Sequence, residues 1–222
     1  MRKTNIVLSA ALATGLLAAP VFAQAKKVEA QGKQVQADKT FEHGKPVDGS
    51  ITLPGLDGKD HKLADYKGKV IVLDFWSFNC PISKRYEDKF KQLVKKYQGK
   101  EVVFLAIDSN KSEIDADAED PYHQIRKYVE KEGVTMNVLV DKGNVIADRF
   151  GAKTTPHVFI LDPKLVLSYQ GSVDNDQRGQ LGKEAMDFVS LAVDALLAGR
   201  EVEHKKTTPF GCSIKRVTKI DG

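Results

Sequence analysis

The sequence predicts an α/β fold with a mixed central sheet, and three observations support this prediction. Short runs of β-branched and apolar residues, typical of buried strands, alternate with longer segments whose apolar residues recur at helical spacing. Their order is strand, helix, strand, helix, then a hairpin and a last helix, which is the pattern of an α/β layer fold. The chain has 222 residues, of which 41% are hydrophobic and 29% charged, so one globular domain with a sizeable core is expected.

The first 23 residues have the pattern of a secretory signal peptide. Arg2 and Lys3 give a positive start, residues 6–19 carry no charge, and small residues end at Ala23. The uncharged run is shorter than the roughly 20 residues that a membrane-spanning helix needs. We therefore expect cleavage after Ala23 and a periplasmic or secreted protein. An uncleaved anchor and a core helix are the alternatives.

Three further segments follow the expected signal peptide. Residues 24–48 are polar and predict a linker or weakly held arm, residues 49–199 contain the periodic segments of the domain, and residues 200–222 form a polar tail. The formal net charge is +4, and no block of five or six basic residues occurs. Nucleic acid is therefore not an expected partner. Stable membrane insertion is not expected either, because no later segment is long and apolar enough.

The first half of the domain is predicted to contain two buried strands joined by a helix. Asp57-Gly58 suits the turn of a short hairpin. Residues 70–76 are β-branched and apolar, and residues 102–107 form a second run of this kind. Pro81 favours the first turn of a helix, and apolar residues continue at helical spacing until Gly99 ends it.

The second half is predicted to contain a short strand, a hairpin and three helices. The five acids within residues 113–120 predict a solvated loop rather than a calcium site, because glycine is missing from the sixth position of a calcium loop. The expected elements are a helix at 122–132, a strand at 138–140, a short helix at 145–150, hairpin strands at 158–161 and 165–169, and a helix from Met186 to Leu197.

Three motifs resemble those of the thioredoxin superfamily. Residues 72–83 (Val-Leu-Asp-Phe-Trp-Ser-Phe-Asn-Cys-Pro-Ile-Ser) are similar to its active-site segment, and Thr154-Thr155-Pro156 is similar to its cis-proline loop. The tail sequence Pro-Phe-Gly-Cys-Ser-Ile-Lys at 209–215 narrows the resemblance to exported peroxiredoxin-like redoxins of bacteria. The resemblance covers residues 51–215 and implies a thioredoxin-like fold, in which helices flank a mixed sheet.

Cys80 is predicted to be a reactive thiol. It stands at the start of the helix that Pro81 begins and at the carboxyl end of a buried strand, where open α/β sheets carry their sites. Unpaired N–H groups and the positive end of the helix dipole favour the thiolate at this position, and Lys84 and Arg85 add positive charge. An inert buried thiol is the alternative.

Three residues near Cys80 are candidates for roles in its chemistry. Ser83 stands where a Cys-x-x-Cys motif has its second cysteine, and it either donates a hydrogen bond to the thiolate or is a tolerated helix residue. Asp74 lies in an otherwise apolar strand, so a raised pKa is expected for its carboxyl group. The resemblance implies that Asp74 moves protons during thiol exchange. Trp76 is expected to pack over the site on the substrate side, without taking part in the chemistry.

The resemblance also implies a docking site for an extended peptide. In the superfamily the peptide bond before the matching proline is cis, and the backbone of the preceding residue pairs with substrate beside the sulfur. Thr155 and Pro156 take these places, and X-Pro bonds are the ones that adopt the cis form. His157 follows directly and is expected to be solvated, with tuning of the thiolate as the alternative.

The resemblance to peroxiredoxins is incomplete at the active site. Ser77, three residues before Cys80, matches their Thr or Ser, but Leu73 stands where their signature has a proline. The hairpin strand has Thr-Thr-Pro-His where they place an arginine, and Arg149 and Arg178 are the remaining candidates for it. The site is therefore expected to be closer to that of a thioredoxin.

The expected function is that of a thiol-disulfide oxidoreductase or a thiol peroxidase-like redoxin. Cys80 attacks a disulfide or a peroxide, and Cys212 resolves the intermediate within one chain or between two, because Ser83 leaves Cys80 without a local partner. An external thiol reductant then recycles the pair. The alternatives are a non-enzymatic module that holds a partner or a metal, and a structural Cys80–Cys212 disulfide. No cofactor is implied, and none of the five histidines has a metal-site spacing with Cys80.

Overall fold

The computed structural model describes residues 40–115 and 118–217. The chain divides into one unit of residues 1–36 and another of residues 37–222, and the described residues all belong to the second. The expected signal peptide, residues 1–23, therefore lies outside the described residues. Within the described ranges, no helix combines the length and the apolar character that crossing a membrane requires.

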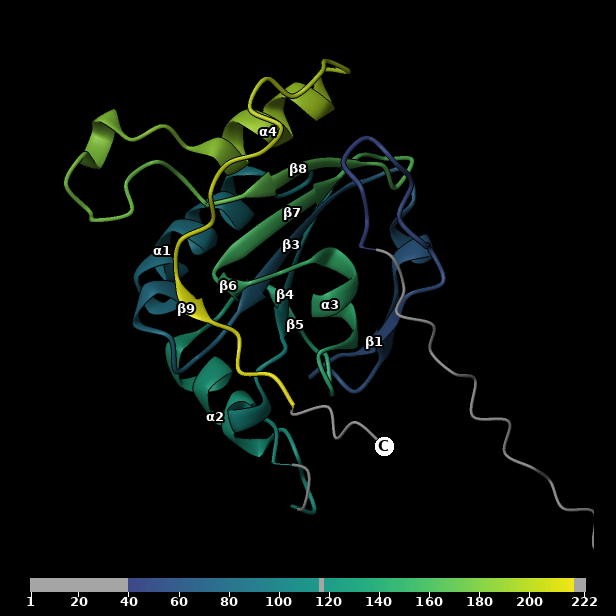
Figure 1. The fold of residues 1–222 in the computed structure, drawn as a ribbon, viewed down its shortest axis with the longest axis vertical. Helices are drawn as coiled ribbons and strands as arrows, with labels where there is room; N and C mark the ends of the chain where they lie inside the picture. Colours follow the sequence, from purple (N-terminus) through teal and green to yellow (C-terminus); the bar gives the residue numbers. More distant parts are fainter. Residues whose placement is uncertain (1–39, 116–117, 218–222) are drawn as a thin grey trace, which may run out of the picture. The chain divides into compact units, whose positions relative to one another are not determined.

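A five-stranded mixed sheet forms the centre of the second unit (Figure 1). Its strands, in spatial order, are β5 (Asn137–Val140), β4 (Val102–Asp108), β3 (Val70–Trp76), β7 (His157–Leu161) and β8 (Leu167–Gly171). β3 pairs in parallel with β4, and β4 with β5. β7 pairs antiparallel with both β3 and β8. The prediction of an α/β fold with a mixed sheet is confirmed.

The central strand β3 is buried along its whole length, because both faces of the sheet are covered. Side chains alternate along a strand, so Val72 and Trp76 enter the apolar core on one face, whereas Leu73 and Phe75 enter the core on the other. The continuous apolar run in the sequence follows from this two-sided burial.

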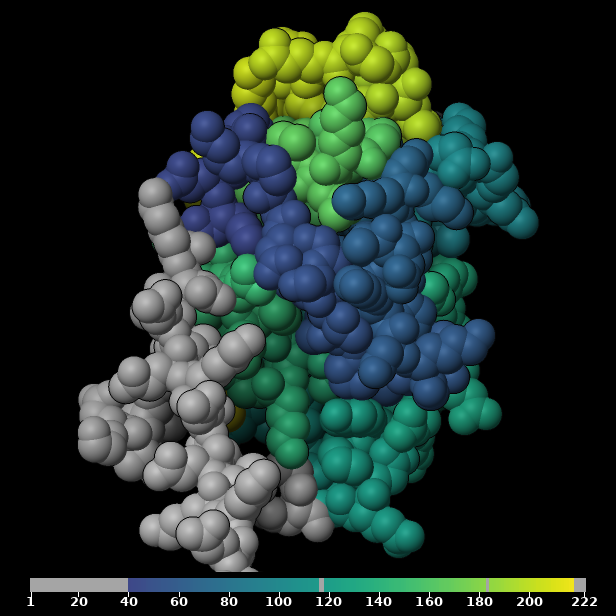
Figure 2. All heavy atoms as spheres, turned by 90° about the vertical axis from the view of Figure 1, so that its right-hand side faces the viewer, coloured from purple at the N-terminus to yellow at the C-terminus, as the bar shows by residue number. Residues whose placement is uncertain are grey.

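Helices cover the two faces unequally. The buried side chains of α1 (Pro81–Lys96), α2 (His123–Glu132) and α4 (Phe188–Leu197) join the core on the Trp76 side. On the other side lie α3 (Val145–Phe150) and the antiparallel hairpin of β1 (Thr52–Pro54) and β2 (Asp60–Lys62). Figure 2 views the molecule from the side where this hairpin lies, in purple and blue.

The short elements join the end of the chain to the sheet. They are β6 (Thr154–Thr155), β9 (Cys212–Ser213) and the 3-10 helices η1 (Leu63–Tyr66), η2 (Lys111–Glu113) and η3 (Gly182–Glu184). β6 and β9 form a separate two-stranded antiparallel ladder. In Figure 1 the yellow C-terminal segment passes the start of α1 and lies beside β6.

Two elements begin two residues later than the sequence predicts, and each has a local cause. α4 begins at Phe188 rather than at Met186, because the side chain of Asp187 accepts a hydrogen bond from the Ser190 N–H at 3.0 Å and caps the helix there. β8 begins at Leu167 because the backbone of Leu165 has a left-handed φ of 65° and belongs to the turn.

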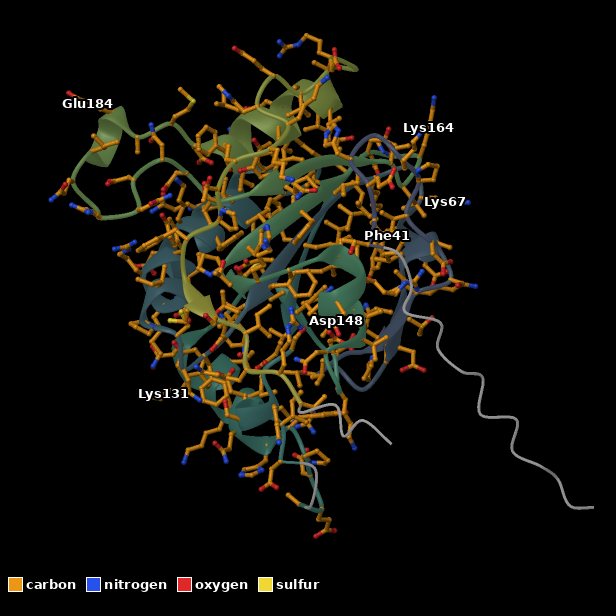
Figure 3. All side chains as sticks on the ribbon, in the orientation of Figure 1. Phe41, Lys67, Lys131, Asp148, Lys164 and Glu184 are labelled. Atoms are coloured by element: carbon orange, nitrogen blue, oxygen red, sulfur yellow. The ribbon has the colours of Figure 1, made fainter. Side chains whose placement is uncertain are left out.

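Residues 41–47 contact the domain, although the expected arm extends to residue 48. The ring of Phe41 lies 4.9 Å from that of Phe150 in an edge-to-face arrangement, and Val47 is buried. The Val47 N–H donates to the carbonyl oxygen of Leu165. Figure 3 shows Phe41 above α3, on the same side of the sheet as Asp148.

Candidate active site

Cys80 lies in the turn between β3 and α1, and 2% of its surface is exposed. It is the N-cap of α1: the sulfur accepts a hydrogen bond from the Ser83 N–H at 3.5 Å, and Pro81 occupies the first turn. The thiol also donates to the carbonyl oxygen of Thr155 at 2.9 Å. The local sequence therefore places the sulfur between the first amides of the helix and the loop before β7.

The C-terminal tail brings Cys212 to the same place. In the β6–β9 ladder Thr155 lies opposite Cys212, and Thr154 lies opposite Ser213. Both cysteines are free thiols, and the thiol of Cys212 interacts with that of Cys80. The structure thus brings the free thiols of Cys80 and Cys212 together at the start of α1.

The two thiols have opposite pKa shifts. Burial acts to raise the pKa of Cys80, but hydrogen bonds from the Cys212 thiol, the Thr155 side chain and the backbone amides of Ser83 and Cys212 outweigh it, so the pKa lies below its usual value. Burial, followed by the interaction with Cys80, raises the pKa of Cys212. At neutral pH the thiolate therefore forms more readily on Cys80.

The tail occupies the edge that was expected to receive substrate. The Thr155–Pro156 peptide bond is cis, and Thr155 is buried beneath β9. A Cβ atom added to Gly211 would lie 2.1 Å from the carbonyl oxygen of Thr155 and 3.0 Å from the nitrogen of Pro156. Since side chains do not approach backbone this closely, only glycine fits immediately before Cys212.

Asp74 is buried near Cys80, with 1% of its surface exposed. Its pKa is raised well above the usual range, mainly by burial and further by the charge on Cys80, and the backbone amide of His157 opposes this shift. The Asp74 carboxyl group therefore keeps its proton to higher pH than an exposed aspartate does, which is the direction that the apolar strand around it predicted.

Neither the Ser83 hydroxyl nor the Trp76 indole N–H has a hydrogen-bond partner in the described part of the chain. The backbone amide of Ser83, in contrast, approaches the Cys80 sulfur. Trp76 is 1% exposed and packs against Phe78 and Tyr128, at ring-centroid distances of 6.4 and 5.9 Å. In this conformation Trp76 is a core residue, and it offers almost no surface to a substrate.

His157 is not solvated, which corrects the expectation for this residue. It is 3% exposed, and its Nδ1 accepts a hydrogen bond from the Lys153 N–H at 3.2 Å. Burial, followed by the charges of Lys153 and Lys206, lowers the pKa of His157 to about 4. A neutral imidazole therefore packs behind the cis-proline loop, where its ring lies 4.4 Å from that of Phe159.

Glu113 supports the loop before Cys80, a role that the sequence analysis missed. One carboxylate oxygen accepts hydrogen bonds from the Ser77 hydroxyl at 2.5 Å and the Asn79 N–H at 3.3 Å, and the other accepts from the Phe78 N–H at 3.2 Å. The Ser77 hydroxyl in turn accepts from the Cys80 N–H at 3.1 Å. Glu113 thus binds three of the four residues, 77–80, that connect β3 to α1.

The expectation of a solvated loop at residues 113–120 is wrong for its first residue. Glu113 is 3% exposed, whereas Asp115 and Glu119 are exposed. Burial, followed by the charge of Glu113, raises the pKa of the neighbouring Asp108 well above its usual value. Apart from the apolar Ile114, the sequence does not indicate that Glu113 is buried beside Asp108, because an acid-rich stretch is ordinarily a solvated surface.

The two basic side chains expected to add positive charge near Cys80 contact groups other than its sulfur. Lys84 lies over the Tyr128 ring at 5.1 Å, and Arg85 donates to the carbonyl oxygen of Gln177 at 2.5 Å. Arg178 is exposed.

Arg149, the second arginine candidate, lies with the N-terminal part of the domain. It pairs with Asp48 at 3.2 Å and lies over the Phe41 ring at 4.7 Å. Ser77, the peroxiredoxin-like hydroxyl, donates to Glu113 rather than to the sulfur.

Comparison with protein families matches residues 43–170 to the AhpC/TSA family. Among individual proteins, thiol-disulfide oxidoreductase ResA of Geobacillus thermodenitrificans is 27% identical over 112 residues, which cover 50% of this chain and 59% of that protein. ResA of Bacillus thuringiensis is 25% identical over 138 residues, which cover 62% of this chain and 71% of that protein. The chain thus spans less than two thirds of the first of these relatives.

Solved structures resemble the domain over a greater length. An uncharacterized conserved protein from Geobacillus kaustophilus is 31% identical, with a TM-score of 0.71, and the match covers 81% of this chain and 95% of that protein. The hypothetical protein SMc02350 from Sinorhizobium meliloti is 26% identical, with a TM-score of 0.69 and coverages of 81% and 97%. The thioredoxin domain of a thiol-disulfide oxidoreductase from Bacteroides vulgatus, which is 18% identical with a TM-score of 0.51, supports the fold alone.

Proposed function

The chain belongs to the AhpC/TSA family and has a thioredoxin-like fold, and from this premise we propose that it is a thiol-disulfide oxidoreductase. The Cys80 thiolate attacks one sulfur of a substrate disulfide, and the other sulfur leaves as a thiolate. Cys212 then attacks the Cys80 sulfur of the mixed disulfide and releases the substrate as a thiol. The substrate gains two electrons, the Cys80–Cys212 pair becomes a disulfide, and an external thiol reductant returns the pair to its reduced form.

The observation that carries this proposal is the contact between the two thiols at the start of α1. Hydrogen bonds to Cys80 lower its pKa, while burial and Cys80 raise that of Cys212. The first thiol is therefore the better attacking group at neutral pH, and the second lies within reach to resolve the intermediate. Asp74, buried near Cys80 and with a raised pKa, is placed to supply or accept a proton as the thiol charges change.

Disulfides suit the site better than peroxides. A peroxide needs hydrogen-bond donors beside the attacking sulfur, but the Ser77 hydroxyl is engaged with Glu113, Arg149 contacts Asp48, and Arg178 is exposed. The Thr155 edge, in contrast, already pairs with an extended strand that presents a cysteine to Cys80. ResA relatives, named thiol-disulfide oxidoreductases, point to the same reaction class.

We also propose export and a matching organisation of the chain. The signal-like residues 1–23 direct the chain to the periplasm or outside the cell, and residues 49–199 carry the redox domain. Residues 200–222 form the tail that returns Cys212 to the site. In an oxidising compartment the pair needs a dedicated thiol reductant, which is the partner that this function requires.

The test uses the reduced full chain and a peptide disulfide. The parent protein is expected to reduce the peptide and to gain an intrachain Cys80–Cys212 bridge, whereas Cys212→Ser accumulates a mixed disulfide on Cys80. Ser213→Ala, an exposed neighbour in β9, is the matched control and behaves as the parent. Mass spectrometry of quenched samples identifies each species. Unchanged turnover in Cys212→Ser would remove Cys212 from the mechanism, and hydrogen peroxide, run in parallel, is expected to react no faster with Cys80 than with free cysteine.

A further inference from the structure

The segment from Gly211 to Val217 lies extended along the loops that follow β4, β5 and α3, and main-chain hydrogen bonds hold much of it. The Ile214 N–H donates to the carbonyl oxygen of Lys153 at 3.1 Å, and the Lys215 carbonyl accepts from the Lys111 N–H at 2.9 Å. These bonds join backbone to backbone and do not depend on which side chains the segment carries. The surface beneath it is therefore able to bind extended peptide in general.

Two buried asparagines add side-chain contacts to the backbone of this segment. Asn110 and Asn144 are 3% and 2% exposed. Asn110 Oδ1 accepts from the Lys215 N–H at 2.9 Å, and Asn144 Oδ1 accepts from the Val217 N–H at 2.7 Å. When the segment leaves, these amide oxygens are available to accept from another peptide or from water.

The backbone conformation of Asn144 indicates why asparagine, rather than glycine, occupies this position. Its φ of 62° lies in the left-handed region, where glycine is favoured and asparagine is tolerated. Glycine would relieve the backbone but would lack the amide group, which donates to the Lys215 carbonyl at 3.4 Å and accepts from Val217. The residue at this position therefore combines a left-handed turn with recognition of a peptide backbone.

Two positions of the segment are restricted in their side chains. Gly211 tolerates no Cβ because the Thr155 carbonyl oxygen is too close. Ile214 is 6% exposed and belongs to the apolar core that also contains Phe75 and Phe150. The side chains of Ser213 and Lys215, in contrast, are exposed. The surface thus selects glycine before the cysteine and an aliphatic residue two positions after it.

We propose that Asn110, Asn144 and the site of Ile214 form a peptide groove in which the tail and the substrate are alternative occupants. The inference rests on the proposed function and names its substrate class: extended segments of protein disulfides with the pattern Gly-Cys-x-aliphatic. The substrate cysteine takes the place of Cys212 beside Cys80. Because the tail is part of the same chain, its effective concentration is high, and poorly matched segments do not displace it.

Alternative occupancy also orders the reaction. While the substrate occupies the groove, Cys80 attacks its cysteine and the other substrate sulfur leaves as a thiolate. The tail then returns, Cys212 forms a bond with the Cys80 sulfur, and the substrate cysteine leaves as a thiolate. Resolution of the mixed disulfide and release of the substrate are therefore one event.

The experiment uses reduced full-length Cys212→Ser, in which a mixed disulfide with Cys80 accumulates. The probes are nonapeptides with the sequence of residues 209–217, their cysteine joined to 5-thio-2-nitrobenzoate. Attack by Cys80 forms the protein–peptide disulfide and releases the coloured thiolate, so the rate is read by absorbance and the product by mass. One peptide has the tail sequence, a second has alanine in place of its glycine, and a third has aspartate in place of its isoleucine. The last two are expected to react at least about tenfold more slowly.

A second protein tests whether the tail competes for the groove. Adding Ile214→Ser to Cys212→Ser weakens the tail and leaves the groove intact, so the rate with the tail-sequence peptide is expected to rise several-fold while the ratio among the three peptides stays unchanged. Lys215→Pro serves the same purpose by removing the N–H that Asn110 binds. Circular dichroism and thermal unfolding establish that each variant is folded.

The outcomes are distinguishable. Equal rates for the three peptides, all faster than glutathione disulfide, would overturn the groove and leave the oxidoreductase standing. Rates that do not respond to Ile214→Ser or Lys215→Pro would show that the tail and the substrate do not compete. If Cys80 reacts with no disulfide, the proposed function itself fails, and the inference fails with it.

Discussion

The two sulfurs of the site are held by different kinds of structure. Cys80 lies between two consecutive elements, β3 and α1, in a buried loop whose amides are fixed by Glu113. Cys212 lies on a two-residue strand whose contacts all come from residues far away in the sequence. β3, the loop after it and the start of α1 form a fixed platform, and local opening is expected to begin at the other half of the site, the tail strand.

The largest expected effect on stability comes from removing the hydrogen bonds between Glu113 and the loop before Cys80. Glu113→Gln keeps the size of the side chain but replaces one acceptor oxygen by an NH2 group that faces other donors. The free energy of unfolding is expected to fall by about 2–4 kcal/mol, and the exchange rate of Cys80 several-fold. Chemical denaturation and thiol-exchange kinetics measure the two effects. The matched control is Glu119→Gln, the same change at an exposed residue of the same stretch, and equal losses in the two variants would contradict the role of Glu113.

The second effect concerns the buried acid of the platform. The pKa of Asp74 is raised in the folded state, so the folded protein retains a proton that the unfolded chain loses above about pH 4. Stability from this group is complete below that pH and declines as pH rises through the folded pKa. Asp74→Asn removes the decline, so the variant is expected to gain roughly 1–3 kcal/mol relative to the parent between pH 4 and 8. If the free energies of unfolding of the parent and of Asp74→Asn change in parallel across this pH range, the raised pKa of Asp74 is contradicted.

The third prediction compares the two thiols directly. Because the pKa of Cys80 is lowered and that of Cys212 raised, the pH midpoint for alkylation of Cys80 is expected below about 8.5 and that of Cys212 above it. Iodoacetamide reaction of the reduced protein, followed peptide by peptide in a mass spectrometer, gives both midpoints in one sample. Coincident profiles would mean that the helix start does not distinguish the two sulfurs.

The smallest effect is expected at the rim of the tail. Arg216 pairs with Asp148 of α3 at 2.8 Å, and both side chains are more than a third exposed (Asp148 is labelled in Figure 3). Arg216→Ala is therefore expected to cost less than about 1 kcal/mol and to raise hydrogen exchange of the Val217 amide by a few-fold. Lys205→Ala, which removes another exposed ion pair, is the control and should leave Val217 unchanged. A change in hydrogen exchange of the Cys80 amide in Arg216→Ala would contradict the separation of the platform from the tail.

The position of Cys80 on the platform could be predicted from the sequence, because its signals are local, whereas the contacts of Glu113 with the loop could not. The apolar run at 70–76 and the proline after Cys80 place a thiol at a helix start without knowledge of any distant residue. The resemblance of the Thr-Thr-Pro and Phe-Gly-Cys motifs added Thr155 as a residue that pairs with an extended peptide and Cys212 as a redox partner of Cys80. The pairing of Thr155 with the tail itself is known only from the structure. The burial of His157 was missed, since a polar residue at a strand start is ordinarily exposed.

Residues that act across the chain gave no sequence signal. Asn110 and Asn144 are polar residues in predicted loops, and only the folded backbone brings them to the segment after Cys212. Glu113 stood in an acidic stretch in which the other described acids, Asp115, Glu119 and Asp120, are fully or partly exposed. Such contacts have no period and no fixed spacing, so propensity and patterning do not reveal them.

The close approach of Gly211 to the Thr155 carbonyl suggests a practical use of the molecule. Gly211→Ala would place a methyl group where no atom fits, so the tail could not return and a captured substrate would stay covalently attached to Cys80. One added carbon would thus convert the catalyst into a variant that traps its substrates. Applied to an extract of the compartment in which the protein works, such a chain would retain its natural clients as disulfide-linked adducts that reducing agent releases for identification.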